Sequence, residues 1–158
     1  MSLEIRPARP GEEGLVLSFV NKLAAYEKLA HEVTATEADI AEALFGAEPR
    51  CRCDLAFWNG APAGFALWFY NFSTFAGKAG IYLEDLFVEP QLRGLGIGKA
   101  LLKQLARRCV DEGLPRLQWW VLEWNEPSIA VYTSLGAKPM DAWTVFRVSG
   151  SELQAQAS

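Results

Sequence analysis

The segment with the most evident chemical potential is rich in glycine and runs from Arg93 to Lys99. It follows a β-rich stretch that ends at Val88, and a helical pattern begins at Gly98. Its three glycines permit positive φ angles and a close approach of the backbone. Exposed amides at such a turn, together with a helix N-terminus, form a cradle for an anion such as a pyrophosphate. Arg93 adds positive charge to this cradle.

Two familiar phosphate-binding patterns do not fit this segment. In the P-loop, a Ser or Thr that binds Mg²⁺ follows the lysine, whereas Ala100 follows Lys99 here. The dinucleotide fingerprint is Gly-x-Gly-x-x-Gly, whereas these glycines alternate as Gly94, Gly96 and Gly98 and lie in the middle of the chain. The pattern therefore predicts either another kind of phosphate cradle or a turn that only joins a strand to a helix.

Two acids and a tyrosine could perform acid–base chemistry. Glu84 and Asp85 are adjacent on a strand predicted over Gly80–Val88. Neighbours on a regular strand point to opposite faces, so both cannot line one cleft unless a bulge intervenes. Tyr132 comes seven residues after Asn125, on the same face of a predicted helix. The alternative interpretations are a charge on a solvated strand face for Glu84 and an amphipathic core tyrosine for Tyr132.

Several short motifs in the same order resemble the GNAT superfamily of N-acetyltransferases. Arg93, Gly96 and Gly98 match the family's Gln/Arg-x-x-Gly-x-Gly/Ala motif. The resemblance extends over nearly the whole chain and points to the spermidine/spermine and thialysine acetyltransferase branch. The other matching motifs are Ile5-Arg6-Pro7-Ala8, Leu23-Ala24-x-Tyr26-Glu27, Leu83-Glu84-Asp85 and Glu123-Trp124-Asn125-Glu126-Pro127-Ser128.

The resemblance implies acetyl-CoA as the co-substrate and no metal. In the family, the glycine loop takes the pyrophosphate and the preceding strand binds the pantetheine arm through its backbone, like an added strand. Asn125 has a simpler interpretation as a helix N-cap, and the two roles are compatible. The implied cofactor-binding residues are Leu86, Phe87, Val88, Arg93, Gly94, Leu95, Gly96, Ile97, Gly98, Lys99, Asn125, Ser128 and Tyr132.

The resemblance also implies direct attack of an amine on the thioester in a ternary complex. Glu84 attracts the cationic amine and helps to deprotonate it, directly or through water, and Tyr132 protonates the leaving thiolate. Tyr26 and Glu27 match a pair that touches the acceptor, although a solvated helix end is an equal interpretation. The implied substrate-binding residues are Tyr26, Glu27, Glu84, Gln118, Trp119, Trp120 and Asp141. Core or dimer packing is the simpler interpretation of the tryptophans.

The acceptor predicted from this resemblance is a primary amine of a small cationic molecule, either a diamine or polyamine or a thialysine- or lysine-like amine. The polyamine enzymes carry paired acids near the C-terminus, where this chain has only Asp141. A non-catalytic acyl-CoA-binding or sensing module and a protein N-acetyltransferase remain alternatives, because fold does not determine function. The branch also implies a homodimer, for which the Trp-rich strand and the tail after Trp143 are candidate surfaces.

Hydrophobic periodicity and turn signals predict the helices and strands that position these residues. The order β-α-α-β-β-β-α-β-α-β predicts a single α/β (α+β) domain over 1–158 with a mixed sheet flanked by helices. The resemblance implies that this is the GNAT fold, in which the sheet is mostly antiparallel. Asn59-Gly60 predicts a hairpin, and Thr34-Ala-Thr-Glu37 predicts a capping box for a helix to Phe45. The predicted ranges are Leu3–Pro7, Cys51–Trp58, Pro62–Tyr70, Gly80–Val88, Arg116–Leu122 and Trp143–Val148 for strands, and Glu12–Lys28, Gly98–Glu112 and Glu126–Leu135 for the other helices. The tail Ser149–Ser158 is expected to fray.

Composition limits the classes of function. The 158 residues carry 15 Lys and Arg against 19 Asp and Glu, a net charge of −4, which argues against nucleic-acid binding and fits a cationic substrate. The single histidine, His31, excludes a His-rich metal site. Three cysteines do not form a secreted disulfide framework. No apolar run is long enough for a bilayer. We therefore expect a cytoplasmic protein that binds no membrane.

Overall fold

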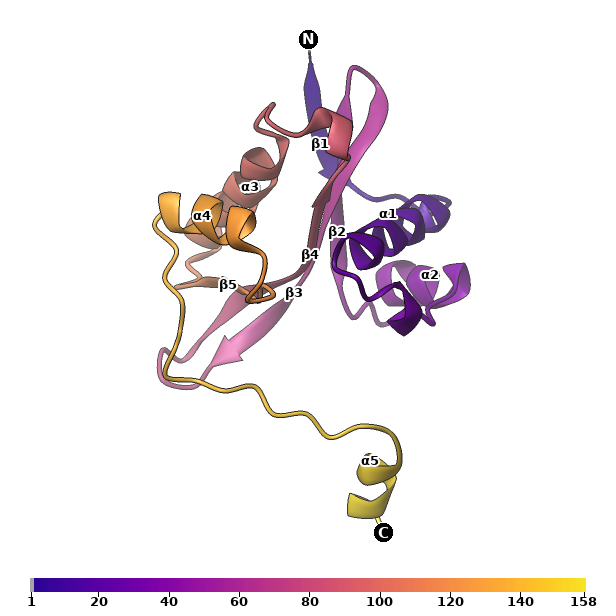
Figure 1. The fold of residues 1–158 in the computed structure, drawn as a ribbon, viewed down its shortest axis with the longest axis vertical. Helices are drawn as coiled ribbons and strands as arrows, with labels where there is room; N and C mark the ends of the chain where they lie inside the picture. Colours follow the sequence, from indigo (N-terminus) through magenta and orange to yellow (C-terminus); the bar gives the residue numbers. More distant parts are fainter. Residues whose placement is uncertain (1) are drawn as a thin grey trace. The chain divides into compact units, whose positions relative to one another are not determined.

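The computed structural model describes residues 2–158 (Figure 1). The chain divides into two compact units, Met1–Trp120 and Val121–Ser158. The first unit contains β1 (Leu3–Pro7), α1 (Glu13–Tyr26), the short helix η1 (Ala30–Glu32), α2 (Glu37–Phe45), β2 (Arg52–Trp58), β3 (Ala61–Ser73), β4 (Lys78–Val88), the short helix η2 (Pro90–Leu92), α3 (Ile97–Glu112) and β5 (Leu117–Trp119). The second contains α4 (Glu126–Ser134) and α5 (Gly150–Gln156).

The sheet of the first unit has the order β1-β2-β3-β4-β5. The pairs from β1 to β4 are antiparallel, and β5 is parallel to β4. Helices α1 and α2 cover one face of the sheet and α3 covers the other (Figure 1). The predicted mixed, mostly antiparallel sheet flanked by helices is therefore confirmed.

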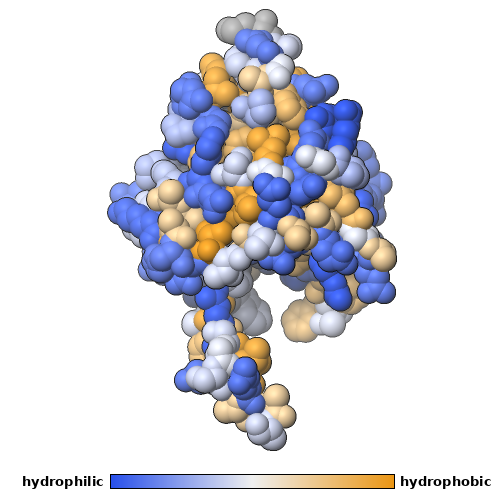
Figure 2. Space-filling view, turned by 90° about the vertical axis from the view of Figure 1, so that its right-hand side faces the viewer, coloured by the Kyte–Doolittle hydropathy of each residue, from blue (hydrophilic) through white to orange (hydrophobic). Residues whose placement is uncertain are grey.

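A hydrophobic core joins α1 and α2 to the sheet. Apolar residues of α1 recur every three to four positions, so one face of the helix is buried. On the side of α1 and α2, Figure 2 shows hydrophobic patches enclosed by hydrophilic residues. The buried members of this core are Val16, Phe19, Leu23, Leu44, Cys53, Leu55, Phe65, Leu67 and Phe87.

Most local signals are confirmed. Asn59 and Gly60 both have positive φ angles, of 51° and 85°, as a two-residue hairpin turn requires. Helix α3 ends at Gly113 in the left-handed conformation, and Pro127 lies in the first turn of α4.

The capping box of α2 lies two residues later than predicted. Thr36 is the N-cap and its side chain accepts a hydrogen bond from the amide of Asp39, whose carboxylate accepts one from the amide of Thr36. The sequence contains two overlapping boxes, Thr34–Glu37 and Thr36–Asp39, and spacing alone does not distinguish them.

The C-terminal elements differ most from the prediction. Residues 143–148 form no strand, and β5 is shorter than the predicted Arg116–Leu122. Within the described chain, no strand pairs with residues 143–148. A β-strand without a partner leaves its backbone N–H and C=O groups unpaired. Trp143 and Phe146 are 76% and 92% exposed. The tail expected to fray contains α5 instead.

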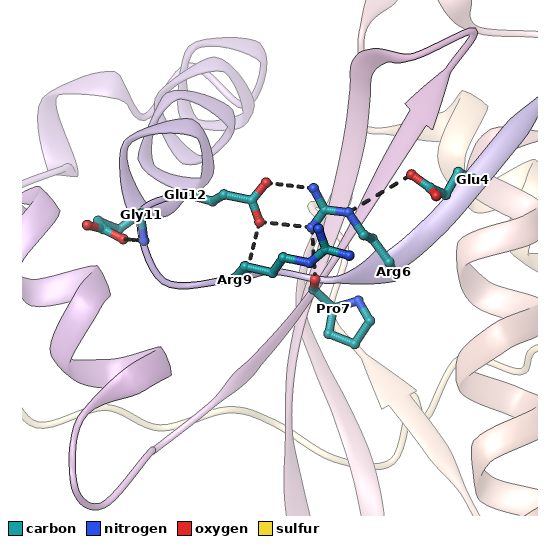
Figure 3. Close-up of polar contacts among 7 residues, drawn as sticks. Glu4, Arg6, Pro7, Arg9, Gly11 and Glu12 are labelled. Carbon is teal, nitrogen blue, oxygen red and sulfur yellow. Dashed lines mark hydrogen bonds and ion pairs between the residues drawn. The ribbon is translucent and has the colours of Figure 1, made fainter.

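A forked ion pair connects β1 to the start of α1 (Figure 3). The two terminal nitrogens of Arg6 donate to the two carboxylate oxygens of Glu12 over 2.9 and 2.7 Å. The amide of Arg9 also donates to Glu12, over 2.7 Å. These hydrogen bonds, the Arg6 bond foremost, lower the pKa of Glu12 from 4.5 to about 2.

We expect Glu12→Gln to lower stability at neutral pH. Because the carboxylate has a lowered pKa in the folded state, its stabilisation is complete above pH 4.5 and is lost as the pH falls toward about 2. Urea unfolding should therefore give a lower midpoint for the variant at pH 7 and equal midpoints near pH 2. Glu4→Gln is the matched control, since Glu4 is mostly exposed and lies 3.9 Å from Arg6. If both substitutions lower the midpoint equally at pH 7, the Arg6–Glu12 ion pair does not have the stabilising role assigned to it.

Candidate active site

The glycine turn before α3 forms an open cradle. Gly94 and Gly96 have φ angles of 85° and 84°, which favour glycine. A Cβ built at either position meets nothing within 4 Å. Gly96 is the N-cap of α3 and supplies no side-chain hydrogen bond to the first turn. The amides that begin α3 therefore face open space without an intrahelical acceptor, which suits an anionic ligand.

Directly before this turn, β4 has an open edge. On the side away from β3, its residues Ile81–Leu83 pair with β5, and in the part of the chain that the structure describes no strand pairs with residues 84–88 there. The amide of Glu89 donates to Ala63 on β3. Because successive backbone groups of a strand alternate in direction, Leu86 and Val88 present theirs to the open edge. The backbone of Phe87 faces β3 and its ring is buried in the core.

Arg93 ties the glycine turn to the end of β4. Its Nε donates to the carbonyl of Val88 over 3.1 Å. The guanidinium lies over two rings, 5.0 Å from the centroid of Tyr26 and 5.6 Å from that of Phe87. Arg93 therefore places positive charge beside the open edge and fixes the turn through cation–π contacts that the sequence did not indicate.

A β-bulge interrupts β4 at the predicted acids. Leu67 pairs with Asp85 but Trp68 pairs with Leu83, so Glu84 has no partner on β3. Asp85 lies opposite a core residue and thus on the α1 face of the sheet. Burial first, and then the charges of Glu84 and Asp85, raise the pKa values of Cys51 and Tyr82. This bulge is the exception under which the two acids need not alternate, because the extra residue re-aims the strand.

Asp85 is the acid that the sequence interpretation missed as a functional candidate. Burial, together with the charges of Glu84 and Glu27, raises its pKa to about 7. Burial also raises the pKa of Glu27. No neighbouring cation lowers either pKa. Glu27, Glu84 and Asp85, here named the acid cluster, therefore favour a cationic ligand.

The other predicted acceptor residues of the first unit lie around β4 and β5. Tyr26 ends α1, and Glu27 follows it as the C-cap. Gln118 accepts a hydrogen bond from Asn71 over 3.2 Å, next to the half-buried Trp119. Trp120 is mostly exposed and packs edge-on against Tyr82, with 5.7 Å between the ring centroids.

Four predicted residues belong to the second unit. Asn125 occupies the N-cap of α4 and is 5% exposed, but its side chain makes no capping hydrogen bond. Ser128 and Tyr132 lie on α4 and are half-buried. Asp141 is exposed in a turn after α4.

The described residues contain neither a cluster of metal ligands nor a membrane-spanning helix. Among residues 2–158, no group of three or more His, Cys, Asp or Glu side chains is placed to hold a metal ion. Within the same residues, no helix has the length and apolarity needed to span a bilayer.

Comparison with known families gives an independent result. The profile described as the Acetyltransferase (GNAT) family matches residues 20–137, more than half of the chain. The chain belongs to the GNAT acetyltransferase family. It is therefore an acetyltransferase. Members of this family use acetyl-CoA.

Relatives and solved structures agree with this membership. Thialysine N-epsilon-acetyltransferase of Bos taurus is 34% identical over 95% of this chain and 94% of its own length. Human spermidine/spermine N(1)-acetyltransferase-like protein 1 is 32% identical over 95% of this chain and 23% of its own length. An integron cassette protein from the mobile metagenome of V. cholerae has a TM-score of 0.82 and 28% identity, covering 99% of this chain and 98% of that one.

Proposed function

We propose that this GNAT enzyme transfers an acetyl group from acetyl-CoA to a primary amine of a small cationic molecule, a diamine or polyamine or a thialysine- or lysine-like amine. One observation carries this proposal: the open edge of β4 runs directly into an uncapped glycine turn. A strand edge suits an extended amide-bearing arm, and the turn suits the pyrophosphate that follows this arm in coenzyme A.

The residues fit acetyl-CoA as the ligand of this edge and turn. Backbone groups of Leu86 and Val88 would bind the pantetheine arm, and the amides from Gly94 to Lys99 would hold the pyrophosphate. Acetyl-CoA supplies the thioester whose carbonyl carbon the amine attacks. The same backbone edge positions that carbonyl. Asn125, Ser128 and Tyr132 remain predicted cofactor contacts from the second unit.

The acid cluster supports a cationic acceptor. An ammonium group has no lone pair, so it must lose a proton before it attacks. Glu84 was predicted as the group that draws this proton, and Asp85 is a second candidate, because its raised pKa suits proton transfer near neutrality. Tyr132 is the proposed acid that protonates the leaving thiolate. Tyr26, Gln118, Trp119, Trp120 and Asp141 remain predicted acceptor contacts.

The pH dependence distinguishes the two acids. If Asp85 is the base, kcat/KM rises with pH around its pKa of about 7, because only the carboxylate accepts a proton. Glu84→Gln removes a charge that raises this pKa, so the midpoint of the profile should move to lower pH. Asp85→Asn should remove the acidic limb and lower kcat/KM by about a hundredfold. A limb that persists in Asp85→Asn and disappears in Glu84→Gln assigns the base to Glu84.

A coupled assay of coenzyme A release with a panel of small amines tests the proposed function. Release that depends on both acetyl-CoA and an amine supports it. Tight binding of acetyl-CoA without release for any amine supports the sensing module instead. Acetylation of peptides but not of free amines supports the protein N-acetyltransferase alternative.

We also propose that the protein is a homodimer and that residues 143–148 contribute to its surface. Large apolar side chains exposed in a row are typical of interaction sites. Multi-angle light scattering should give a dimer for the wild type and a monomer for Phe146→Asp. Val110→Asp, at an apolar position of α3 that is also exposed, is the matched control and should stay dimeric. A monomeric wild type overturns the proposal.

A further inference from the structure

The connection between β4 and α3 carries the glycine turn but has no anchor of its own in the core. It runs from Glu89 to Gly96, and none of its side chains is buried. Its first part is closed by η2, where the amides of Leu92 and Arg93 donate to backbone carbonyls over 2.9 and 3.3 Å. Residues 89–93 therefore form a compact unit, and its position depends on the contacts that its two ends make.

Helix α1 contacts both ends of this unit. Lys22 forms an ion pair with Glu89, whose side chain is 13% exposed. One helical turn later, the ring centroid of Tyr26 lies 5.0 Å from the guanidinium carbon of Arg93. Residues four positions apart share one face of a helix, so both contacts come from the same side of α1. We name Lys22 and Tyr26 together the α1 clamp.

The two contacts belong to one surface feature of the first unit. Both residues of the α1 clamp and both of their partners line a single groove of about 580 Å³, together with Phe87 at the end of β4. Arg93 also donates from Nε to the carbonyl of Val88. A carbonyl oxygen has two lone pairs, so Val88 keeps one for a ligand at the open edge. The clamp thus holds the connection without closing the edge of β4.

The glycine turn inherits its orientation from this clamped unit. Gly94 follows Arg93 directly, and a Cβ built at Gly94 or Gly96 meets nothing within 4 Å. Glycine adopts more backbone conformations than any other residue, so a movement of Arg93 would redirect the amides that follow it. A turn that is already held in place loses less conformational entropy when it binds an anion.

We propose that the two residues of the α1 clamp are positioning residues for acetyl-CoA: by holding Glu89 and Arg93 against α1, they keep the glycine turn ready to bind the pyrophosphate. The inference rests on the proposed function and adds to it two residues that act through the turn. It assigns the ring of Tyr26 to the cofactor side, whereas the resemblance assigned this residue to the acceptor.

Two single variants of the ion pair separate positioning from simple attraction of an anion. Lys22→Met removes a positive charge and Glu89→Gln removes a negative one, but each breaks the pair. Both should weaken acetyl-CoA binding by about fivefold in calorimetry, the effect of one partly exposed ion pair. If Lys22 only attracts the cofactor, Glu89→Gln should bind acetyl-CoA at least as tightly as the wild type does, and that result overturns the proposal.

A distant lysine and a kinetic comparison are the controls for these variants. Lys103→Met removes the same charge as Lys22→Met from an exposed position of α3 outside the groove, and it should bind acetyl-CoA like the wild type. In Lys22→Met and Glu89→Gln, the loss should appear in the KM for acetyl-CoA, with kcat unchanged. A lower kcat with an unchanged KM for acetyl-CoA contradicts a positioning role in cofactor binding.

Two variants of Tyr26 distinguish its ring from its hydroxyl group. Phenylalanine keeps the aromatic face beside Arg93, so Tyr26→Phe should keep the wild-type affinity for acetyl-CoA. Leucine has no such face, and Tyr26→Leu should weaken binding by about fivefold, the effect of one cation–π contact. Equal losses in both variants assign the effect to the hydroxyl group, and no loss in either leaves the ring without this role; each result overturns the assignment of the ring.

Hydrogen exchange without any ligand separates this proposal from the proposed function. Peptides that cover residues 89–96 should exchange about fivefold faster in Glu89→Gln and Tyr26→Leu than in the wild type, because each contact contributes to the local stability of this connection. If the wild type binds no acetyl-CoA, the proposed function fails, and faster exchange in the variants still supports the clamp. Unchanged exchange in both variants overturns the clamp, even where acetyl-CoA is bound and its acetyl group transferred.

Discussion

Gly96→Val is expected to weaken acetyl-CoA binding by about a hundredfold or more, the loss of two charge-assisted hydrogen bonds. Gly96 has a φ of 84°, which a β-branched residue tolerates poorly, and it is the N-cap from which α3 begins. A Cβ at this position meets no protein atom within 4 Å. The new side chain would therefore fill the cradle and move its amides. Isothermal titration calorimetry measures the affinity.

The matched control for this variant is Gly113→Val. Gly113 caps the other end of α3, has a φ of 71°, and also has open space around its Cβ position. It therefore carries the same backbone strain without touching the cradle. Loss of stability should be similar for both variants, whereas acetyl-CoA affinity should fall only in Gly96→Val. Normal affinity in Gly96→Val would falsify the cradle assignment.

The second large effect is expected for Tyr132→Phe, which removes only a hydroxyl group. General acid catalysis contributes about a hundredfold or more, so kcat should fall by this amount while acetyl-CoA affinity stays within about twofold. Steady-state kinetics across pH, combined with calorimetry, measure both properties.

Tyr70→Phe is the control for the hydroxyl group. The Tyr70 hydroxyl bonds Glu112 of α3 over 2.8 Å, outside the candidate active site. Its loss should leave kcat unchanged. If kcat also stays unchanged in Tyr132→Phe, Tyr132 is not the acid, and water or another group protonates the thiolate.

The two candidate bases illustrate where sequence interpretation reaches its limit. Alternation on a regular strand separates Glu84 from Asp85, and the resemblance favours Glu84. The bulge opposite Leu67 and Trp68 cancels this alternation. The raised pKa of Asp85 depends on its burial and on Glu27, which lies more than fifty positions earlier in the chain. Neither property can be predicted from the local residues, because the bulge depends on the pairing of β4 with β3, and the pKa of Asp85 depends on its burial and on Glu27 at the end of α1.

The same division applies to the charges between α1 and the end of β4. The motif predicted that Arg93 adds charge to the loop, and the structure places its guanidinium over Tyr26 and Phe87. Lys22 and Glu89 carry no motif signal, yet they form an ion pair between α1 and the residue that follows β4. Contacts between distant segments create this charge pattern, so it has no signature along the chain.

By itself, the sequence determined the features that depend on local backbone chemistry. These are the glycine turn before α3, the Asn59-Gly60 hairpin and the period of the helices, together with the family that the motif order indicates. Tertiary structure decided the features that require a partner: the bulge at Glu84, the pKa of Asp85, the Lys22–Glu89 pair, and the absence of a strand at residues 143–148. A turn needs only its own φ angles, whereas a strand, an ion pair or a shifted pKa needs a second segment brought into contact by folding.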